Sequence, residues 1–206
     1  MQGSLLVIEG IDGSGKSLQA KALKEALEMK GKKVLALSYP DKNSDYGKII
    51  YSFLLSNKQM SSEEQFFLYI LDMIKDKEKI EKALSSGTFV ILDRYFFSTL
   101  AYQCSEGFAY ARAESLIELS GLQKPDEVFF IDIPIEIAMS RKLKQRGGEG
   151  NFDRFENDKE ILGKAKKEYD KLLNQKLFCE KWVRIDGLLS SDKISGQILS
   201  SLGGLV

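Results

Sequence analysis

Near its N-terminus the chain reads Gly10-Ile11-Asp12-Gly13-Ser14-Gly15-Lys16-Ser17, and this stretch decides the fold. Its spacing is that of a phosphate-binding loop, in which a glycine and four further residues precede Gly-Lys-Ser or Gly-Lys-Thr. An apolar run typical of a buried strand, Leu5–Ile8, comes just before it, and Ala20, Leu23 and Leu27 recur after it at helical spacing. The glycines therefore lie between a strand and a helix, which is the setting that such a loop requires.

The residue types in this loop suit the binding of a nucleoside triphosphate. Glycine lets the backbone curl so that successive N–H groups point at phosphate oxygens, and the helix N-terminus adds its partial positive charge there. Lys16 is placed to reach the β- and γ-phosphates, and Ser17 offers a hydroxyl to a magnesium ion. The residues assigned to the nucleotide are Gly10, Ile11, Asp12, Gly13, Ser14, Gly15, Lys16 and Ser17. The loop alone does not distinguish a kinase from a GTPase or a motor.

Composition narrows the class of protein. The 206 residues include 30 Lys and Arg against 30 Asp and Glu, so the chain has no overall basic field and we expect no nucleic acid polymer as a partner. The lack of histidine excludes histidine acid–base chemistry and most zinc sites but leaves phosphoryl transfer open. Cys104 and Cys179 have no metal-ligand spacing, and no apolar run is long enough to span a bilayer. We expect a cytoplasmic protein with reduced cysteines and no membrane partner.

Five apolar runs predict the strands of the fold, and helical segments separate them. The runs are Leu5–Ile8, Lys33–Leu37, Phe89–Leu92, Val128–Ile131 and Val183–Ile185. Such alternation predicts an α/β fold with a five-stranded parallel sheet and helices on both faces, here as a single domain over residues 1–206. Ligands of these sheets bind beyond the carboxyl ends of the strands, so the residues after each run are candidates for the site.

The third run is followed by two charged residues, Asp93 and Arg94. A carboxylate at a strand end can hold the magnesium shell or orient a nucleophile, and a phosphate-binding loop requires such a neighbour. Arg94 suits anion binding because its guanidinium is a planar fork of donors. We therefore expect Asp93 and Arg94 to lie close to the loop.

A cationic segment predicts a flap at about residues 142–156. The preceding helix carries Arg141 and Arg146, ends in the glycine-rich stretch 147–151, and is followed by Arg154. A cationic helix end joined to glycines favours a short mobile flap, or LID, over the triphosphate. The alternative is a solvated charged helix with a loose turn after it.

The helix expected after Ser61 carries an acidic residue on an apolar face. Ser61 and Glu64 form a capping box at its start, and Asp72 lies among apolar residues that include Ile70 and Met73. An acid on an apolar face is usually paired or lies near a pocket. Asp72 therefore has either a functional role or a place in a structural ion pair.

The chain resembles the thymidylate kinase family over nearly its whole length. Besides the loop, the matching stretches are Tyr39-Pro40-Asp41-Lys42, Asp93-Arg94-Tyr95 with Ser98 and Ala101-Tyr102-Gln103, Lys124-Pro125-Asp126, Asp132 with Pro134 and Arg141, and Asp153-Arg154-Phe155-Glu156. The stretch from Asp93 to Gln103 is the most specific of them. The resemblance implies a P-loop kinase that transfers a phosphoryl group from MgATP to dTMP, giving dTDP and ADP.

The resemblance also implies roles for single residues on the ATP side. Lys16 and Ser17 hold the ATP phosphates and magnesium, and Asp93 serves the magnesium and phosphate centre. Arg141 lies against the adenine. Arg146 and Arg154 are the flap arginines, candidates for stabilising charge on the transferred group.

On the acceptor side, the resemblance implies that Arg94 holds the dTMP phosphate and that Asp12 accepts a hydrogen bond from the 3′-hydroxyl of the sugar. Tyr95 presses where a ribose 2′-hydroxyl would lie, which favours deoxyribose. The other residues assigned to dTMP are Tyr39, Lys42, Tyr69, Ser98, Tyr102 and Gln103. The resemblance further implies a homodimer that pairs through helices beside the phosphate-binding loop.

Three residues depart from the family pattern. Lys42 stands where an arginine usually grips the dTMP phosphate, so the charge stays but bidentate geometry is lost. Met73 stands where a second arginine is expected, which removes a cation, and Thr99 replaces a usual glycine. Each lost charge-assisted contact is worth about 1.5–3 kcal/mol. Acceptor identity therefore stays open on the sequence.

Two alternatives to a dTMP kinase follow from these departures. One is a related P-loop kinase that acts on another deoxynucleotide or a deoxynucleoside, because a neutral acceptor needs fewer cations. The other is a nucleotide-switched binding module that turns ATP over slowly. The acceptor-side stretch from Asp93 to Gln103 argues against the second alternative.

Overall fold

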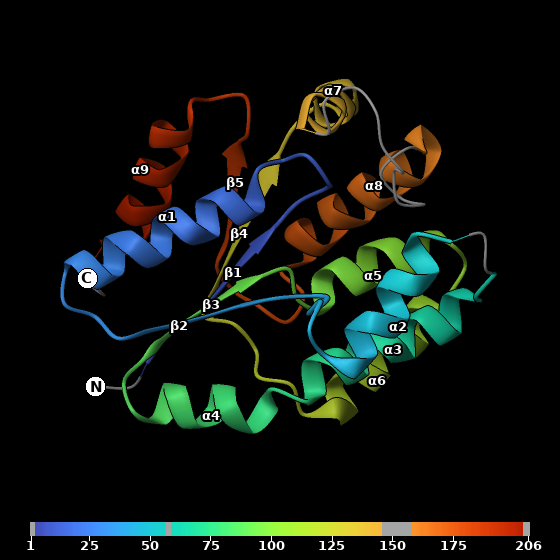
Figure 1. Cartoon of the computed structure of the whole chain (residues 1–206), viewed down its shortest axis with the longest axis horizontal. Helices are drawn as coiled ribbons and strands as arrows, with labels where there is room; N and C mark the ends of the chain where they lie inside the picture. Colours follow the sequence, from blue (N-terminus) through green and yellow to red (C-terminus); the bar gives the residue numbers. More distant parts are fainter. Residues whose placement is uncertain (1–2, 57–58, 146–157, 204–206) are drawn as a thin grey trace.

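A computed structural model describes residues 3–56, 59–145 and 158–203, and its centre is a five-stranded parallel sheet (Figure 1). The strands are β1 (Leu5–Glu9), β2 (Val34–Ser38), β3 (Phe89–Asp93), β4 (Glu127–Asp132) and β5 (Trp182–Asp186). They lie in the order β2-β3-β1-β4-β5 and every pairing is parallel. The predicted α/β class and all five predicted strands are confirmed, with boundaries that differ by about one residue.

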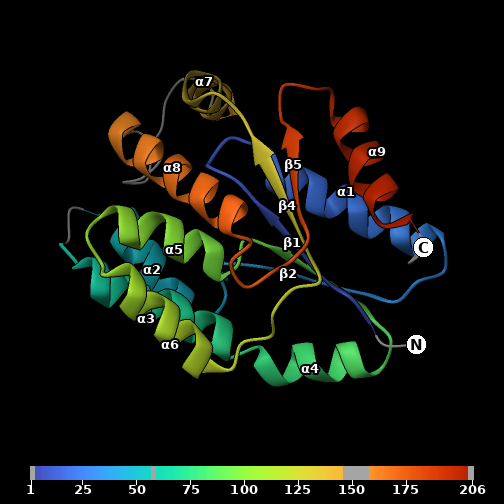
Figure 2. The same cartoon turned by 180° about the vertical axis from the view of Figure 1, so that it is seen from behind.

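Helices cover both faces of this sheet, as the two opposite views show (Figures 1 and 2). One face carries α1 (Lys16–Met29) and α9 (Ser191–Ser201), which pack against each other. The helices α2 (Asp45–Leu54), α3 (Ser62–Ile74), α5 (Phe96–Ser105), α6 (Tyr110–Ser120) and α8 (Lys159–Gln175) gather on the other face. The remaining helices of the described residues are α4 (Lys77–Ser85) and α7 (Ile135–Gln145).

The two faces correspond to two apolar cores, because successive side chains of a strand point to opposite sides. In β1, Leu5 and Val7 enter the core shared with α3, α5 and α8, whereas Leu6 and Ile8 enter the core shared with α1 and α9. These four side chains are at most 1% exposed. A central strand that is apolar on both sides is typical of a parallel sheet covered by helices.

Several local predictions also hold, and two differ. The capping box of Ser61 and Glu64 begins α3, and Asp158 accepts hydrogen bonds from the first turn of α8. The sequence pattern does not separate α4 from α3, because the residues between them, Lys75 and Asp76, include neither glycine nor proline. The sequence pattern predicts a helix from Lys159 to about Phe178, but α8 ends earlier, at Gln175, since the next residue, Lys176, adopts a left-handed backbone.

The parallel sheet places the functional stretches together. Ile8 of β1 pairs with Asp93 of β3 and with Phe129 of β4, so the residues that follow β1 and β3 leave the sheet at the same edge. Within the described ranges, no helix combines the length and the apolar character needed to cross a bilayer.

Candidate active site

The phosphate-binding loop runs from the end of β1 to the N-terminus of α1. Gly15 precedes the helix with φ 98° and Gly13 has φ 83°, values in the left-handed region that favours glycine. A Cβ atom on Gly13 would lie 2.4 Å from the carbonyl oxygen of Ala138 in α7. Gly13 therefore allows both the turn of the loop and the close approach of α7.

Lys16 lies at the floor of the loop, with 5% of its surface exposed. Its Nζ donates to the carbonyl oxygen of Ile11 at 2.9 Å, which folds the side chain back over the loop. Burial and the nearby Arg94 cation lower the pKa of Lys16 to about 8. The lysine is thus held in the loop as a cation that is costly to keep charged without an anion beside it.

Asp93, at the end of β3, faces the loop directly. Ser17 donates from Oγ to Oδ2 of Asp93 at 2.5 Å. The other carboxylate oxygen, Oδ1, is buried and has no hydrogen-bond partner among the described residues. A buried carboxylate oxygen and a serine hydroxyl at one point supply oxygen ligands of the kind that magnesium prefers.

Arg94 follows Asp93 with φ 67°, a left-handed backbone that is uncommon for any residue other than glycine. This turn brings its guanidinium to the loop, where it donates to Asp12 at 2.6 Å and to the carbonyl oxygen of Gly10 at 3.3 Å. It also donates to Ser98 at 2.9 Å. Burial works to raise the pKa of Asp12, but the cations Arg94 and Lys16 hold that pKa well below its usual range.

The loop and the Asp93–Arg94 corner open onto one cleft of about 1440 Å³. The predicted residues that line it are Asp12, Gly13, Ser14, Gly15, Lys16, Ser17, Tyr39, Lys42, Tyr69, Asp93, Arg94, Tyr95, Ser98, Tyr102, Gln103 and Arg141. Gly10 and Ile11, the first two residues of the loop, are buried and do not line the cleft. Arg146 and Arg154 and most of the predicted flap lie outside the described residues.

The three residues that depart from the family pattern, Met73, Thr99 and Lys42, all line the cleft. Met73 is 1% exposed and Thr99 is 2% exposed, and both line the cleft. The hydroxyl of Thr99 is buried without a hydrogen-bond partner among the described residues. Lys42 is exposed, with Nζ 5.3 Å from the ring centroid of Tyr51. The cleft is therefore apolar at Met73 and carries an exposed cation at Lys42, with the exposed Lys48 also in its lining.

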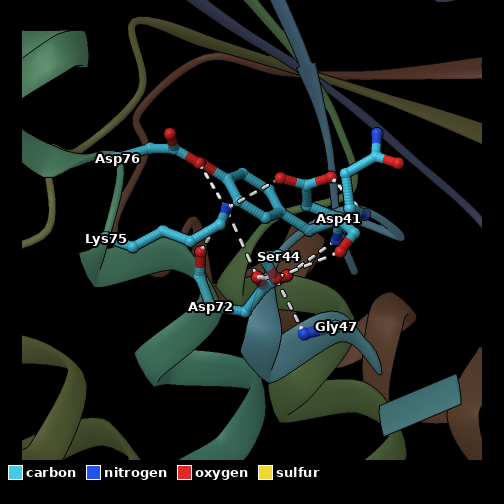
Figure 3. Close-up of polar contacts among 8 residues, drawn as sticks. Asp41, Ser44, Gly47, Asp72, Lys75 and Asp76 are labelled. Atoms are coloured by element: carbon cyan, nitrogen blue, oxygen red, sulfur yellow. Dashed lines mark hydrogen bonds and ion pairs between the residues drawn. The ribbon is translucent and has the colours of Figure 1, made fainter. Parts of the chain in front are cut away.

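Asp72 joins α3 to the loop that carries Lys42 (Figure 3). Its Oδ2 accepts from the backbone N–H of Asp41 at 2.8 Å, and its Oδ1 accepts from Ser44 at 2.5 Å. Lys75 lies 3.3 Å from the same carboxylate. With 0% of Asp72 exposed, the structural alternative is the one that the geometry supports, since the carboxylate faces its own chain.

On the opposite side of the loop, Arg141 of α7 reaches the segment after β5. Its Nη2 donates to the carbonyl oxygen of Gly187 at 2.9 Å. Leu189 and Ile194, which follow this segment, also line the cleft. Arg141 is thereby held where a flat guanidinium can stack on a planar ring.

The sequence assigns no role to Glu9, which belongs to the stretch that matches the family, and does not single out Tyr169; the structure buries both completely beside Arg94. Glu9 accepts hydrogen bonds from the start of α5, and Tyr169 donates to it from α8. The one available signal is that Tyr169 falls on the buried face of α8, in line with Leu162, Ala165 and Leu172.

A phosphate-binding loop that shares its cleft with an acidic strand end and a neighbouring arginine defines a kinase of the P-loop class. Three comparisons place the chain within this class. The family model for thymidylate kinase matches residues 8–198. The chain is 37% identical over 198 residues to a probable thymidylate kinase of Pyrococcus horikoshii. The matched region covers 93% of this chain and 91% of the relative. The chain belongs to the thymidylate kinase family.

Further relatives agree. A thymidylate kinase of Thermosipho africanus is 35% identical over 202 residues, or 95% of each chain. A solved structure of thymidylate kinase from Candida albicans superposes with a TM-score of 0.75 at 26% identity, over 98% of this chain and 91% of that one. The likeness therefore extends over nearly the whole of this chain.

Proposed function

We propose that this chain transfers the γ-phosphoryl group of MgATP to dTMP, giving dTDP and ADP. The observation that carries the proposal is the contact between the phosphate-binding loop and the strand end at Asp93 and Arg94. Ser17 of the ATP loop lies 2.5 Å from Asp93, and Asp12 of the same loop lies 2.6 Å from Arg94. A donor phosphate on the loop and an acceptor phosphate on Arg94 would therefore face each other within one cleft.

In this reaction a phosphate oxygen of dTMP attacks the γ-phosphorus, and the bond from that phosphorus to the β-bridging oxygen breaks. The protein supplies position and positive charge rather than covalent chemistry. Lys16 neutralises the β- and γ-phosphates, and Arg94 holds the acceptor phosphate with a planar fork of donors. Arg146 and Arg154 remain our candidates for the charge on the transferred group, from the resemblance alone.

The donor set at Ser17 and Asp93 fits a magnesium ion. The buried Oδ1 of Asp93 has no partner among the described residues, and a carboxylate oxygen left unpaired in a site is costly unless a ligand meets it. When bound, magnesium would neutralise charge on the ATP phosphates. Asp93 and Ser17 would hold it, directly or through water.

The acceptor assignments rest on the lining of the cleft. Tyr69, Tyr102 and Gln103 supply the flat and amide surfaces that a thymine ring needs, and Tyr95 lies buried where the sugar would approach. Asp12 keeps one carboxylate oxygen beyond its contact with Arg94, which can accept from a sugar hydroxyl.

ADP release with MgATP and a panel of acceptors tests the proposal. We expect dTMP to stimulate turnover far above dUMP, thymidine and the ribose analogue of dTMP. Stimulation by thymidine but not by dTMP would favour a deoxynucleoside kinase, which the apolar Met73 motivates. Equal ADP release with and without every acceptor would instead indicate a nucleotide-switched module.

We further propose that the chain forms a homodimer. Phe67, Leu71 and Ile74 of α3 are 38%, 39% and 37% exposed and follow one helical stripe. This stripe supports pairing through α3. Light scattering checks it: the wild-type chain should have twice the monomer mass, and Leu71→Glu should be monomeric.

The free thiols of Cys104 and Cys179 support a cytoplasmic location.

A further inference from the structure

A chain of buried hydrogen bonds connects α8 to the guanidinium of Arg94. Tyr169 of α8 places its hydroxyl 2.8 Å from Oε2 of Glu9 and 2.8 Å from Oγ of Ser98. Ser98 in turn accepts from Nη1 of Arg94 at 2.9 Å. Glu9 and Tyr169 are both 0% exposed, and neither lines the cleft. Tyr169 can therefore influence a bound acceptor only through its neighbours.

The carboxylate of Glu9 is filled by donors. Its Oε1 accepts from the backbone N–H groups of Tyr95 at 2.8 Å and Ser98 at 3.2 Å. Its Oε2 accepts from the hydroxyls of Ser98 at 2.7 Å and Tyr169 at 2.8 Å. A protonated Glu9 would add another donor where the hydroxyls of Ser98 and Tyr169 are already committed. The ionised form is thus the one that satisfies this arrangement, although burial raises the pKa of Glu9.

This arrangement decides which way the Ser98 hydroxyl points. A serine hydroxyl has one proton, and here it goes to Glu9, which leaves the oxygen lone pairs free for Arg94. The Tyr169 hydroxyl completes the set of donors on Glu9 and lies against the same oxygen of Ser98. If the tyrosine hydroxyl is removed, Glu9 loses one of its four donors and Ser98 loses a neighbour that restricts its rotation.

The tyrosine ring itself is held firmly. It stacks on Phe130 of β4 with ring centroids 5.0 Å apart and an interplanar angle of 25°. Helices α8 and α5 also pack closely along their length, so the ring of Tyr169 and the backbone of Ser98 belong to one rigid unit. A rigid donor fixes its acceptor better than a side chain that is free to rotate.

We propose that Tyr169 is a positioning residue for the acceptor phosphate, which acts through Glu9 and Ser98 to fix the guanidinium of Arg94. The proposal rests on the function proposed above, because it takes Arg94 as the group that holds dTMP. It assigns to α8 a part in acceptor binding although no α8 residue lines the cleft in the described part of the chain. Arg94 keeps its contacts to Asp12 and Gly10 without Tyr169. We therefore expect its guanidinium to stay in the site but to become more mobile.

Tyr169→Phe removes only the hydroxyl and tests the proposal. We expect KM for dTMP to rise roughly two- to tenfold, the worth of one net hydrogen bond, with KM for MgATP unchanged. Tyr110→Phe is the matched control, because the Tyr110 hydroxyl is also buried but has no hydrogen-bond partner among the described residues. A Tyr169→Phe enzyme with the wild-type KM for dTMP would overturn the proposal, as would an equal change in Tyr110→Phe.

A double-mutant cycle separates positioning from general loosening of the fold. Since Tyr169 acts through Ser98, Tyr169→Phe should have no further effect on KM for dTMP in a Ser98→Ala background. Additive effects would contradict the proposal.

Arginine side-chain NMR signals of Arg94, assigned by their loss in Arg94→Lys, should shift in Tyr169→Phe but not in Tyr110→Phe. This readout needs no turnover, so a wild-type chain inactive on dTMP would refute the proposed function without deciding the role of Tyr169.

Discussion

Ser17 and Asp93, which are separated by 76 residues in the chain, meet at 2.5 Å because β1 and β3 are neighbours in the sheet. The contact leaves Oδ1 of Asp93 buried and unpaired among the described residues. Asp93→Asn changes the carboxylate into a neutral amide, which binds a cation less strongly. We expect activity to require at least tenfold more magnesium, since a charge-assisted contact is worth about 1.5–3 kcal/mol.

Magnesium titrations of turnover measure this effect. Asp132→Asn is the control, because Asp132 ends the neighbouring strand β4 but pairs with Arg184 and Lys166 instead of facing the loop. Its magnesium requirement should match that of the wild type. A wild-type magnesium requirement in Asp93→Asn would remove the carboxylate from the metal site.

Lys16 gives a prediction about protons. Burial and Arg94 lower its pKa to about 8 in the free protein, and phosphate anions beside it will raise that pKa again. At about pH 9 the free lysine is largely neutral, so binding of MgATP should take up a proton. At about pH 7 the lysine is already charged, and this uptake should vanish.

Calorimetry in buffers of different ionisation enthalpy measures the uptake. Lys16→Ala should abolish both the proton uptake at high pH and the transfer reaction. Its circular dichroism spectrum should stay that of the wild type. The same proton uptake in Lys16→Ala would show that another group titrates. Near-normal turnover in that variant would refute the role of the lysine in transfer.

Ser44 provides a test of the acceptor-side loop (Figure 3). It donates to Asp72 and caps α2 by accepting from Gly47 N–H at 2.8 Å, so it ties the loop that carries Lys42 to α3. Ser44→Ala should lower the free energy of unfolding by about 1 kcal/mol and raise KM for dTMP severalfold, with KM for MgATP unchanged.

Ser61→Ala is the matched control, because Ser61 caps α3 in the same way but has no contact with Asp72. Denaturant unfolding should give a similar stability loss, and steady-state kinetics should give a wild-type KM for dTMP. If both variants raised that KM equally, the effect would come from lost stability and not from the position of the loop.

The sheet could be predicted from the sequence because its three central strands, β1, β3 and β4, are apolar on both faces and glycine or polar residues follow them. The same holds for the capping box of Ser61 and for the phosphate-binding loop, in which every requirement is local. The helix α4 could not be separated from α3, since no residue between them breaks a helix.

The contacts that decide the site were not predictable in the same way. Asp72 finds Asp41 and Ser44 across 31 and 28 residues, and no periodicity within α3 indicates them. Likewise, the left-handed backbone of Arg94 follows from its place between Ile8, Asp12 and Ser98, with its N–H donated to Ile8 at 3.0 Å. Tertiary partners fix these side chains, so the sequence could name the residues but not their directions.

Met73 stands where the resemblance to the family leads us to expect an arginine, and restoring that arginine is a sharp test of the proposed acceptor site. Met73 is 1% exposed and lines the cleft. Met73→Arg would place an unpaired cation in a buried site, so we expect the free protein to lose stability. Bound dTMP supplies the missing partner, so its dissociation constant should fall roughly tenfold or more, and the melting temperature should recover when dTMP is added.

Met73→Leu controls for the change in packing, because it keeps the apolar volume without a charge. Calorimetry should give this variant the wild-type affinity for dTMP, and its melting temperature should respond to dTMP as the wild type does. Thymidine, which lacks the phosphate, separates two positions for the arginine: equal tightening of dTMP and thymidine would place Met73 beside the base, and tightening of dTMP alone beside the phosphate. An unchanged or weaker affinity of Met73→Arg for dTMP would remove Met73 from the acceptor site altogether.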